Sequence, residues 1–482
     1  MDVPNLFCII YKKIVDFCGG IVLSGKEEKR AVLLVVTLGA FITPYMSSSV
    51  NIALPAIGSQ FGMNAVTIGW VSTSYLLAAA VFLVPFGRIA DIHGRKKIYL
   101  YGVSLITLSS LLCGLSGSEA LLIVFRLLQG FGSSMVFGTG VAILTSVFPA
   151  AERGRALGIN LASTYMGLSL GPVLGGLLTQ HLTWRSIFFF NVPLGLIIIA
   201  AVLIKLKDEW AEAQQERFRF ADSIFYGLAL IGIMYGFLLL PGLLGGLLIV
   251  IGISGFIGFG LFEARTKSPI LDMALFRNNR TFIFSSLAAL INYSATFAVG
   301  FLLSLYLQYI KGFDPRTAGF VLVIQPAFQA LLSPFSGRLS DRVEPRKVAS
   351  AGMLLTVMGL FLLIFLNEAT HIIFIAASLM LLGIGFALFS SPNTNAVMGS
   401  VDKRFYGVAS GVLGTMRLMG QVFSMGTATL VFALHIGRVS ITRQYYGRFI
   451  ESSRIIFIIL TALCVAGIFS SLARKKRGVE SV

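Results

Sequence analysis

Two arginines lie deep inside long apolar runs of this 482-residue chain. Arg126 opens the segment RLLQGFGSS, and Arg417 lies within GTMRLMGQ. A guanidinium stays charged at physiological pH and offers five N–H donors, so it can bind an anion, hold a water molecule or contact backbone carbonyls. Placing this group inside a membrane span costs at least about 2.5–3.5 kcal/mol. We therefore expect both side chains to face the interior of a helix bundle or a wet cavity, with purely structural carbonyl contacts as the alternative.

Neutral polar side chains occur inside several other apolar runs. Each of them can hydrogen-bond a ligand, and each can equally join two neighbouring helices. Together with Arg417, they are candidates for ligand contacts. They are Asn51, Asn292, Tyr293, Gln325, Gln329, Asn393 and Asn395.

A short basic motif occurs twice in the chain, 250 residues apart. The first copy, GRIADIHGRKK, covers Gly87–Lys97, and the second, GRLSDRVEPRK, covers Gly337–Lys347. In the first copy, the Asp91 carboxylate can pair with neighbouring cations and face the positive N-terminus of a nearby helix. The second copy is less regular, because Glu344 and Pro345 interrupt its glycine pattern.

The two copies predict a gate between moving parts, and a solvated basic loop is the simpler alternative. Glycine suits both close approach and a tight turn in such a segment. We expect the gate to contain Gly87, Asp91, Gly94, Arg95, Lys96, Gly337 and Asp341. In a closed state, Asp91 is expected near Tyr406 and Gly407.

A third pattern, GLSLGPVLGG, spaces three glycines four residues apart, so that they share one helix face. Such a strip favours tight helix packing, and the proline beside it weakens the backbone hydrogen-bond ladder. Packing alone explains the pattern, whereas a sliding contact between two halves is the functional interpretation. The residues are Gly167, Gly171, Pro172, Gly175 and Gly176.

Other site chemistries lack the necessary residues. The four cysteines form no CxxC pair, and the four histidines are scattered, so neither a disulfide framework nor a metal cluster is expected. No nucleophile–base pair stands out, and no GxxxxGK[ST] phosphate-binding loop occurs. We expect no cofactor, no metal and no enzymatic activity.

Composition shows which elements must position these residues. Hydrophobic residues make up 56% of the chain and charged residues 12%. We find fourteen apolar runs that are long enough to cross a bilayer core of about 30 Å. Helices satisfy their own backbone hydrogen bonds in lipid, so the sequence predicts an all-α membrane protein. The predicted spans are 31–57, 67–87, 98–116, 120–147, 155–180, 184–204, 221–240, 243–262, 281–310, 316–336, 348–366, 370–398, 405–435 and 454–473.

The repeat also predicts the order of domains. The 250-residue shift aligns the six spans of 31–204 with the six of 281–473, which indicates a duplicated bundle. Residues 205–280 hold a charged loop and two spans without a counterpart in the repeat. Residues 1–30 form a lead without a signal-peptide cleavage pattern, and 474–482 form a basic tail.

The net charge of +17 is explained by topology. Most of the 38 Lys and Arg residues fall on one side of the predicted spans, and this bias places both termini in the cytoplasm of a cell membrane. We interpret the basic charge as contact with anionic lipid headgroups, and we expect no nucleic-acid partner. The segment 436–453, with several arginines on the opposite side, departs from the rule.

Taken together, these motifs make the chain resemble the major facilitator superfamily, in particular its fourteen-span drug:proton antiporter branch. The resemblance runs from about residue 31 to near the end. It rests on GRIADIHGRKK, on Arg126, Gln129 and Gly130 in RLLQGFGSS, on the glycine strip GLSLGPVLGG, and on WRSIFFFNVPLG from Trp184 to Gly195. It implies two six-helix bundles plus two extra helices, and it implies that the candidate positions for ligand contacts line a central substrate cavity.

The resemblance also implies a function. We expect a secondary transporter working by alternating access, which exports amphipathic organic compounds or drugs in exchange for protons, as a monomer. Relatives often carry an aspartate in the first span, but here Met46 stands at that place in YMSSSVNIALP. The proton carrier is therefore open among Asp91, a water molecule near Arg126 and the substrate. Two deep arginines without a deep carboxylate keep an organic-anion transporter as the alternative, and a non-transporting membrane sensor is a further one.

Overall fold

The computed structural model describes residues 27–206, 208–211, 220–263, 276, 279–401, 406–437 and 439–473. For the helical residues 27, 28, 150, 151, 153, 154, 341, 406 and 407, it describes the backbone but not the side chain. Most of the predicted lead 1–30, most of the charged loop 205–219 and the tail 474–482 therefore lie outside the described residues.

Fourteen helices are long and apolar enough to span a membrane, and this confirms the predicted number. Two of the spans each contain two elements: α10 continues into η2, and α11 is followed directly by α12. The elements are α2 (Glu27–Phe61), α3 (Ala65–His93), α4 (Arg95–Gly114), α5 (Glu119–Val147), α6 (Ala150–His181), α7 (Arg185–Lys205), α8 (Phe220–Leu238), α9 (Leu243–Glu263), α10 (Arg280–Leu305), η2 (Tyr306–Ile310), α11 (Pro315–Leu322), α12 (Ile324–Arg342), α13 (Pro345–Leu363), α14 (Ile372–Met398), α15 (Tyr406–His435), η4 (Arg443–Tyr445) and α16 (Tyr446–Leu472).

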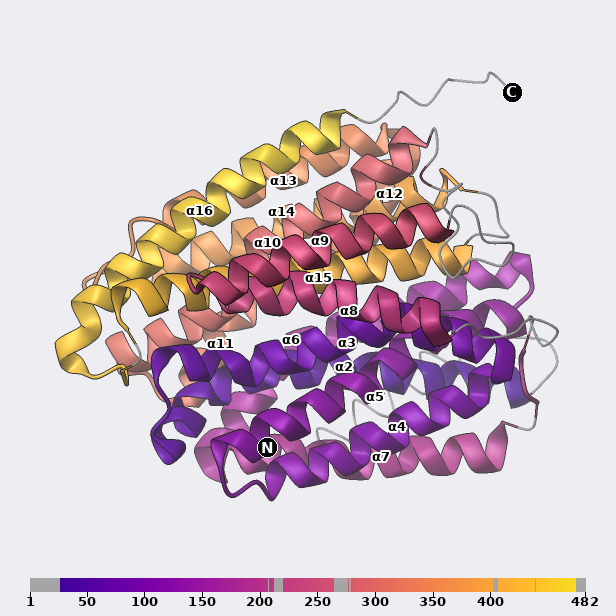
Figure 1. Cartoon of the computed structure of the whole chain (residues 1–482), viewed down its shortest axis with the longest axis horizontal. Coiled ribbons are helices and arrows are strands. Elements are labelled where there is room, and N and C mark those ends of the chain that lie inside the picture. Colours follow the sequence, from indigo (N-terminus) through magenta and orange to yellow (C-terminus); the bar gives the residue numbers. More distant parts are fainter. Residues whose placement is uncertain are drawn as a thin grey trace.

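The helices form two six-helix bundles plus two extra helices, as expected (Figure 1). Helices α2–α7 pack mainly on one another in the lower part of the view, and α10, α12, α13, α14, α15 and α16 do so in the upper part, whereas α11 packs chiefly against α6. The extra helix α8 packs against α3 and α15, while α9 packs chiefly against α8. Most of α9 is exposed, with large apolar side chains such as Leu243, Val250 and Ile251 on its surface. The extra pair therefore lies outside the two bundles, although the predicted limits of each domain remain a prediction.

The two bundles meet along α3 and α15. A Cβ atom at Gly414 would lie 2.9 Å from a side-chain carbon of Leu83, and at the other end of the pair the Ala65 N–H donates to the Val439 carbonyl at 3.1 Å. This contact is thus antiparallel and runs along most of both helices. The α6 helix contacts α11 and α12 on a second line between the bundles.

Several spans differ from those predicted. The last span begins at Tyr446 rather than near residue 454, so Arg448 and Arg454 lie in α16 instead of a loop. The predicted span 316–336 is interrupted at Val323, where α11 ends. The start of α11 is fixed by Asp314, whose carboxylate accepts from the Thr317 N–H at 2.8 Å. This backbone hydrogen bond lowers the pKa of the Asp314 carboxyl from its usual value.

The glycine strip of α6 packs mostly within one bundle. A Cβ atom at Gly167 would overlap the Phe41 carbonyl of α2, one at Gly171 would overlap the Ser48 hydroxyl, and one at Gly175 would lie 2.9 Å from Ser49. For these three residues, the predicted sliding contact between halves is wrong, because their shared face is turned toward α2.

The other two residues of this pattern lie between the bundles. A Cβ atom at Gly176 would overlap the Pro315 carbonyl of α11, and the Pro172 carbonyl lies against Gly319 of the same helix. Gly176 lies one position after Gly175, about 100° around the helix, so it faces a different neighbour. The contact between halves in this segment is therefore made by Pro172 and Gly176.

Neighbouring alanine substitutions separate these two roles. Gly175→Ala inserts a methyl group against the α2 backbone, and we expect it to destabilise the folded protein by about 1–3 kcal/mol. Gly176→Ala instead pushes α6 away from α11, so hydrogen exchange should increase in Pro315–Leu322 with a smaller loss of stability. Thermal unfolding and hydrogen exchange of the detergent-purified protein would measure both effects. Gly158→Ala is the control, because its Cβ atom meets no neighbour within 4 Å. Unchanged exchange in α11 of Gly176→Ala would contradict the assignment.

Candidate functional site

The first copy of the basic motif forms a one-residue turn between two helices. The α3 helix ends at His93 and α4 begins at Arg95, so Gly94 alone connects them. Gly94 has a φ of 114°, which residues with a side chain rarely adopt. The predicted loop is therefore much shorter than expected, and Asp91 lies in the last turn of α3.

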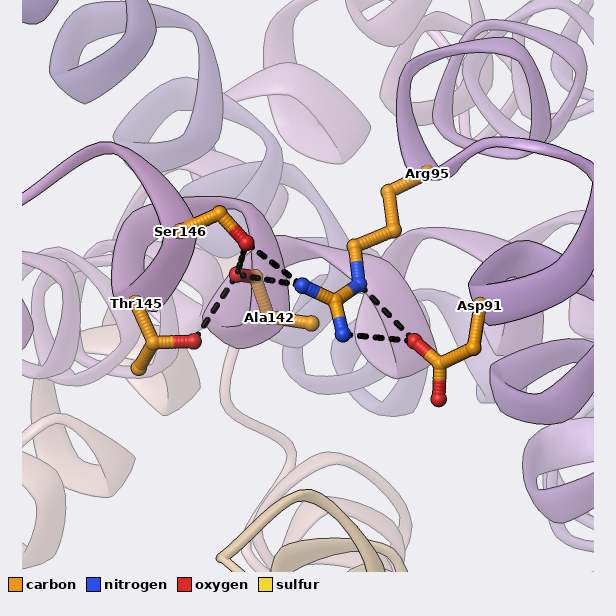
Figure 2. Close-up of polar contacts among 5 residues, drawn as sticks. All are labelled: Asp91, Arg95, Ala142, Thr145 and Ser146. Carbon is orange, nitrogen blue, oxygen red and sulfur yellow. Dashed lines mark hydrogen bonds and ion pairs between the residues drawn. The ribbon is translucent and has the colours of Figure 1, made fainter. Parts of the chain in front are cut away.

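The Asp91 carboxylate pairs with Arg95 across this turn (Figure 2). Arg95 Nε donates to Asp91 Oδ1 at 2.8 Å, and Nη2 lies 2.7 Å from the same oxygen. The Arg95 side chain is only 8% exposed, compared with 33% for Asp91. A carboxylate that accepts two N–H groups from a mostly buried guanidinium forms a strong charge-assisted contact.

The same guanidinium ties the turn to α5. Arg95 Nη1 donates to the Ala142 carbonyl at 3.4 Å and to the Ser146 hydroxyl, both near the C-terminal end of α5 (Figure 2). The helix dipole places partial negative charge at that end, which favours a nearby cation. Three helices are thus held by one side chain. The expected contact of Asp91 with Tyr406 and Gly407 involves side chains outside the described residues, so it remains a prediction.

A contact from the segment after α7 was missed by sequence reasoning. The Glu209 carboxylate accepts from the Lys96 N–H at 2.8 Å, and the Trp210 carbonyl accepts from the Arg95 N–H at 2.9 Å. The first N–H groups of a helix have no partner within it, so these two acceptors cap α4. A Cβ atom at Gly94 would lie 2.5 Å from the Glu209 carboxyl carbon. Gly94 therefore supplies both the turn and the space for this carboxylate, and only the tertiary structure brings residues 94 and 209 together.

The second copy of the motif lies at the junction of α12 and α13. Gly337 is placed in α12, where a Cβ atom would lie 3.2 Å from the Ser391 hydroxyl of α14. The Glu344 carboxylate pairs with Arg346 at 3.0 Å and approaches Lys347 at 3.8 Å. Asp341 belongs to α12, but its side chain lies outside the described residues, so its role in a gate remains a prediction.

Arg126 is held inside the first bundle by neighbouring helices. Its side chain is among the most buried, with the residue 1% exposed. Nε donates to the Val71 carbonyl of α3 at 2.9 Å, Nη1 donates to Gln129 Oε1, and the guanidinium lies 4.5 Å from the centre of the Tyr75 ring. A Cβ atom at Gly130 would overlap the Tyr75 carbonyl. These contacts favour the structural interpretation of Arg126.

The hydrogen bonds continue from Arg126 to the position of the missing aspartate. Gln129 Nε2 donates to the Ser110 hydroxyl of α4 at 2.7 Å, and that hydroxyl lies 3.9 Å from Met46 Sδ in α2. Met46 itself is fully buried. A carboxylate at position 46 would thus lie at the end of a polar chain that begins at Arg126.

Arg417 has a different environment in the second bundle. It is half-buried in α15, and Nη2 donates to the Thr394 hydroxyl of α14 at 2.7 Å. The guanidinium lies 5.8 Å from the centre of the Tyr293 ring of α10. Its Nε is buried and has no hydrogen-bond partner among the described residues. The two arginines therefore differ at Nε, which has a backbone partner in Arg126 and none among the described residues in Arg417.

The other predicted cavity residues have mixed surroundings. Asn51 accepts from the Ser72 hydroxyl at 2.9 Å, Asn393 donates to the Ser285 carbonyl at 3.1 Å, and Asn395 donates to the Ser340 hydroxyl at 2.9 Å. These three join helices. Gln325 is half-buried and Gln329 is buried, both in α12. Asn292 is fully buried in α10, and neither of its side-chain polar atoms has a partner within the described part of the chain.

A comparison with known families agrees with this architecture. A sequence model of the Major Facilitator Superfamily matches residues 36–266 and 285–481. The chain belongs to this superfamily. Its members are transporters and not enzymes, so this chain is a multi-pass membrane transporter of the alternating-access type.

The chain is similar to several transporters whose names state a function. The chain is 28% identical over 461 residues to the riboflavin transporter RibZ of Clostridioides difficile, covering 95% of this chain and 100% of that protein. It is 32% identical over 407 residues to the multidrug resistance protein Stp of Mycobacterium tuberculosis, covering 83% and 75% respectively. A bacterial homologue of the human lysosomal transporter Spinster, solved in an inward-facing unoccupied conformation, has the same fold with a TM-score of 0.68 at 15% identity, covering 94% of this chain and 100% of that one.

The Asp91–Arg95 pair leads to a prediction about transport rate. Asp91→Asn keeps the shape of the side chain but removes the charge. Since a gating contact contributes about 1–3 kcal/mol, we expect turnover to fall about 5- to 150-fold with little change in substrate affinity. Glu209→Gln should have a smaller effect in the same direction. Substrate binding and uptake in proteoliposomes would measure both. Glu451→Gln, a charge loss at an exposed position of α16, is the control; equal rates for Asp91→Asn and this control would favour the solvated-loop alternative.

The two deep arginines should differ in their effect on stability. Arg126→Ala removes the partner of Gln129 and leaves a packing defect among three helices. Because a buried acceptor without a partner costs about 1–3 kcal/mol, we expect a clear decrease in the thermal unfolding midpoint. Arg417→Ala should lower the midpoint less, since part of that guanidinium is unpaired. Equal decreases in detergent-purified protein would show that the structural role of Arg126 is wrong.

Proposed function

We propose that this transporter exports amphipathic organic compounds or drugs from the cytoplasm in exchange for protons. In this proposal it acts as a monomer in the cell membrane, with both termini in the cytoplasm. The proposal combines the family, the named functions of similar proteins and the charge bias of the sequence. The multidrug resistance protein supports export, and the riboflavin transporter supports a planar organic substrate.

The observation that supports alternating access best is a set of hydrogen bonds that bridges the bundles at the end opposite the α3–α4 turn. Ser304 of α10 donates to the Asn51 carbonyl of α2 at 2.7 Å, and Gln308 donates to the Ile52 carbonyl at 3.0 Å. Each such hydrogen bond contributes only about 0.5–1.5 kcal/mol to the contact between α2 and α10. The two bundles can therefore stay together at this end and still separate during the transport cycle. With the proposed orientation, this end faces outward and is closed.

Closure at the outer end gives the Asp91–Arg95 pair a place in the cycle. The pair lies at the opposite end, at the junction of α3, α4 and α5, and α3 runs beside α15 of the other bundle. A rocking motion that separates α2 from α10 must bring the opposite ends of the bundles together. In our proposal, the paired side chains then form part of the contact that closes the cytoplasmic side.

The proton carrier in this proposal has three candidates. In the described spans the carboxylates lie near helix ends, and Asp91 is already paired with Arg95. The chain from Arg126 to Met46 offers a path for polar contacts, but no carboxylate ends it. We propose that the proton moves at Asp91, on a water molecule near Arg126, or with the substrate.

Transport in proteoliposomes tests this function. In vesicles with an acidic lumen, transporter molecules whose cytoplasmic side faces outward should move at least one of three probes into the lumen. The probes are ethidium as a lipophilic cation, chloramphenicol as a neutral drug and fluorescein as an organic anion. Trapped pyranine should report a matching loss of luminal protons. Met46→Asp should change the pH dependence of uptake, because it adds a titrating group at the end of the polar chain.

Two outcomes would contradict parts of the proposal. Counterflow of a probe without any response to the pH gradient would exclude proton antiport. If fluorescein were then the probe that moved and the other two did not, the organic-anion alternative would be favoured. Absence of both driven uptake and counterflow for all three probes would favour a non-transporting sensor. Liposomes without protein provide the baseline for passive leakage of each probe.

A further inference from the structure

The environment of Arg417 defines the chemistry that a ligand needs at this site. The residue lies eleven positions after the start of α15, which corresponds to about 16 Å along the helix and places it far from either end of the span. A permanent charge at this depth is costly unless acceptors surround it. The protein supplies Thr394 as one acceptor and the Tyr293 ring as one aromatic face, while Nε remains unpaired.

The three helices that supply Arg417 and its described contacts carry no negative charge that would balance it or attract a cation. Helices α10, α14 and α15 contain neither Asp nor Glu. An organic cation would meet a like charge here without a compensating carboxylate, which opposes binding. An anionic or strongly accepting group instead gains hydrogen bonds from donors that are already desolvated.

Aromatic side chains determine the shape that this ligand should have. The Tyr293 ring meets the Phe386 ring edge to face, with centroids 5.1 Å apart. Tyr293 is half-buried, so part of its surface remains accessible beside the guanidinium. Flat rings stack on such surfaces with a gain beyond their buried area. A planar aromatic body next to an acceptor group matches both features.

This cluster also lies at the meeting of the two bundles. Ser390 precedes Thr394 by one helical turn on α14, and its hydroxyl lies 3.4 Å from the Tyr165 hydroxyl of α6. A ligand on Arg417 is therefore within one helical turn of a contact that links the bundles. Such a position allows binding energy to depend on the conformation, as a transporter requires.

We propose that Arg417, Tyr293 and Thr394 bind the anionic or hydrogen-bond-accepting end of a planar aromatic substrate. This inference rests on the proposed transport function and specifies its substrate class. Arg417 contacts the acceptor group, Thr394 orients the guanidinium, and Tyr293 stacks on the ring system. Arg126 has no part in this site, because it lies in the other bundle, where the Val71 carbonyl accepts from its Nε and Gln129 Oε1 from its Nη1.

Two dyes with one skeleton test the proposal. Fluorescein and rhodamine 123 are both planar xanthenes, but the first is anionic and the second cationic at neutral pH. Fluorescence anisotropy with detergent-purified protein should show that fluorescein binds more tightly than rhodamine 123. Arg417→Gln should weaken fluorescein binding at least tenfold, about 1.4 kcal/mol, and leave rhodamine 123 unchanged. Arg417→Lys should retain part of the fluorescein affinity.

A matched control separates the site from general charge effects. Arg448 of α16 lies 5.9 Å from the centre of the Tyr445 ring, so Arg448→Gln removes the same charge beside an aromatic ring elsewhere in the chain. It should leave fluorescein binding unchanged. Failure of the wild-type protein to bind fluorescein, or equal binding by wild type and Arg417→Gln, would overturn the proposal. Binding that depends on Arg417 without any transport in proteoliposomes would support the site and reject the proposed function.

Discussion

A polar group that leaves water in this protein must find its partner inside the protein, because lipid offers none. Arg126 illustrates how far this constraint reaches. Its guanidinium contacts a carbonyl of α3, a side chain of its own helix and the face of Tyr75, and Gln129 extends the contacts to α4. One charged residue thereby fixes the relative positions of three helices in the first bundle. The close approach at Gly130 is part of the same arrangement, since α3 must lie near enough to supply its carbonyl.

The need for partners inside the protein also shapes the contacts within each bundle and those between the two bundles. Within the first bundle, Gly167, Gly171 and Gly175 bring α6 against the backbone of α2, and a contact this close cannot slide without overlap. Between the bundles, α6 and α11 approach each other as closely at Gly176 and Gly319, whereas other contacts are single hydrogen bonds such as Ser304 to Asn51. Tight packing within a bundle and weaker bonding at such points between bundles are the physical conditions for two bodies that rock against each other.

The turn at Gly94 connects the first bundle to the segment that follows α7. Arg95 joins α3, α4 and the end of α5, while residues 209 and 210 cap α4 from the segment that leads to the extra helices. Of the extra pair, α8 packs on α3 and α15, which belong to different bundles, and α9 packs on α8. The additional helices are therefore joined to the boundary between the bundles through α8.

The sequence by itself determined the number of spans, the two bundles with their extra pair and the membership of the superfamily. These follow from run length, apolar composition and motif spacing, which are local properties. It did not determine which of two similar arginines has a buried Nε without a described partner, which face of the α6 strip meets the other bundle, or that Glu209 caps α4. Those facts depend on which atoms from distant segments meet. A rotation of about 100° between adjacent helix positions separates Gly175 from Gly176, and only the packed structure shows which neighbour each one touches.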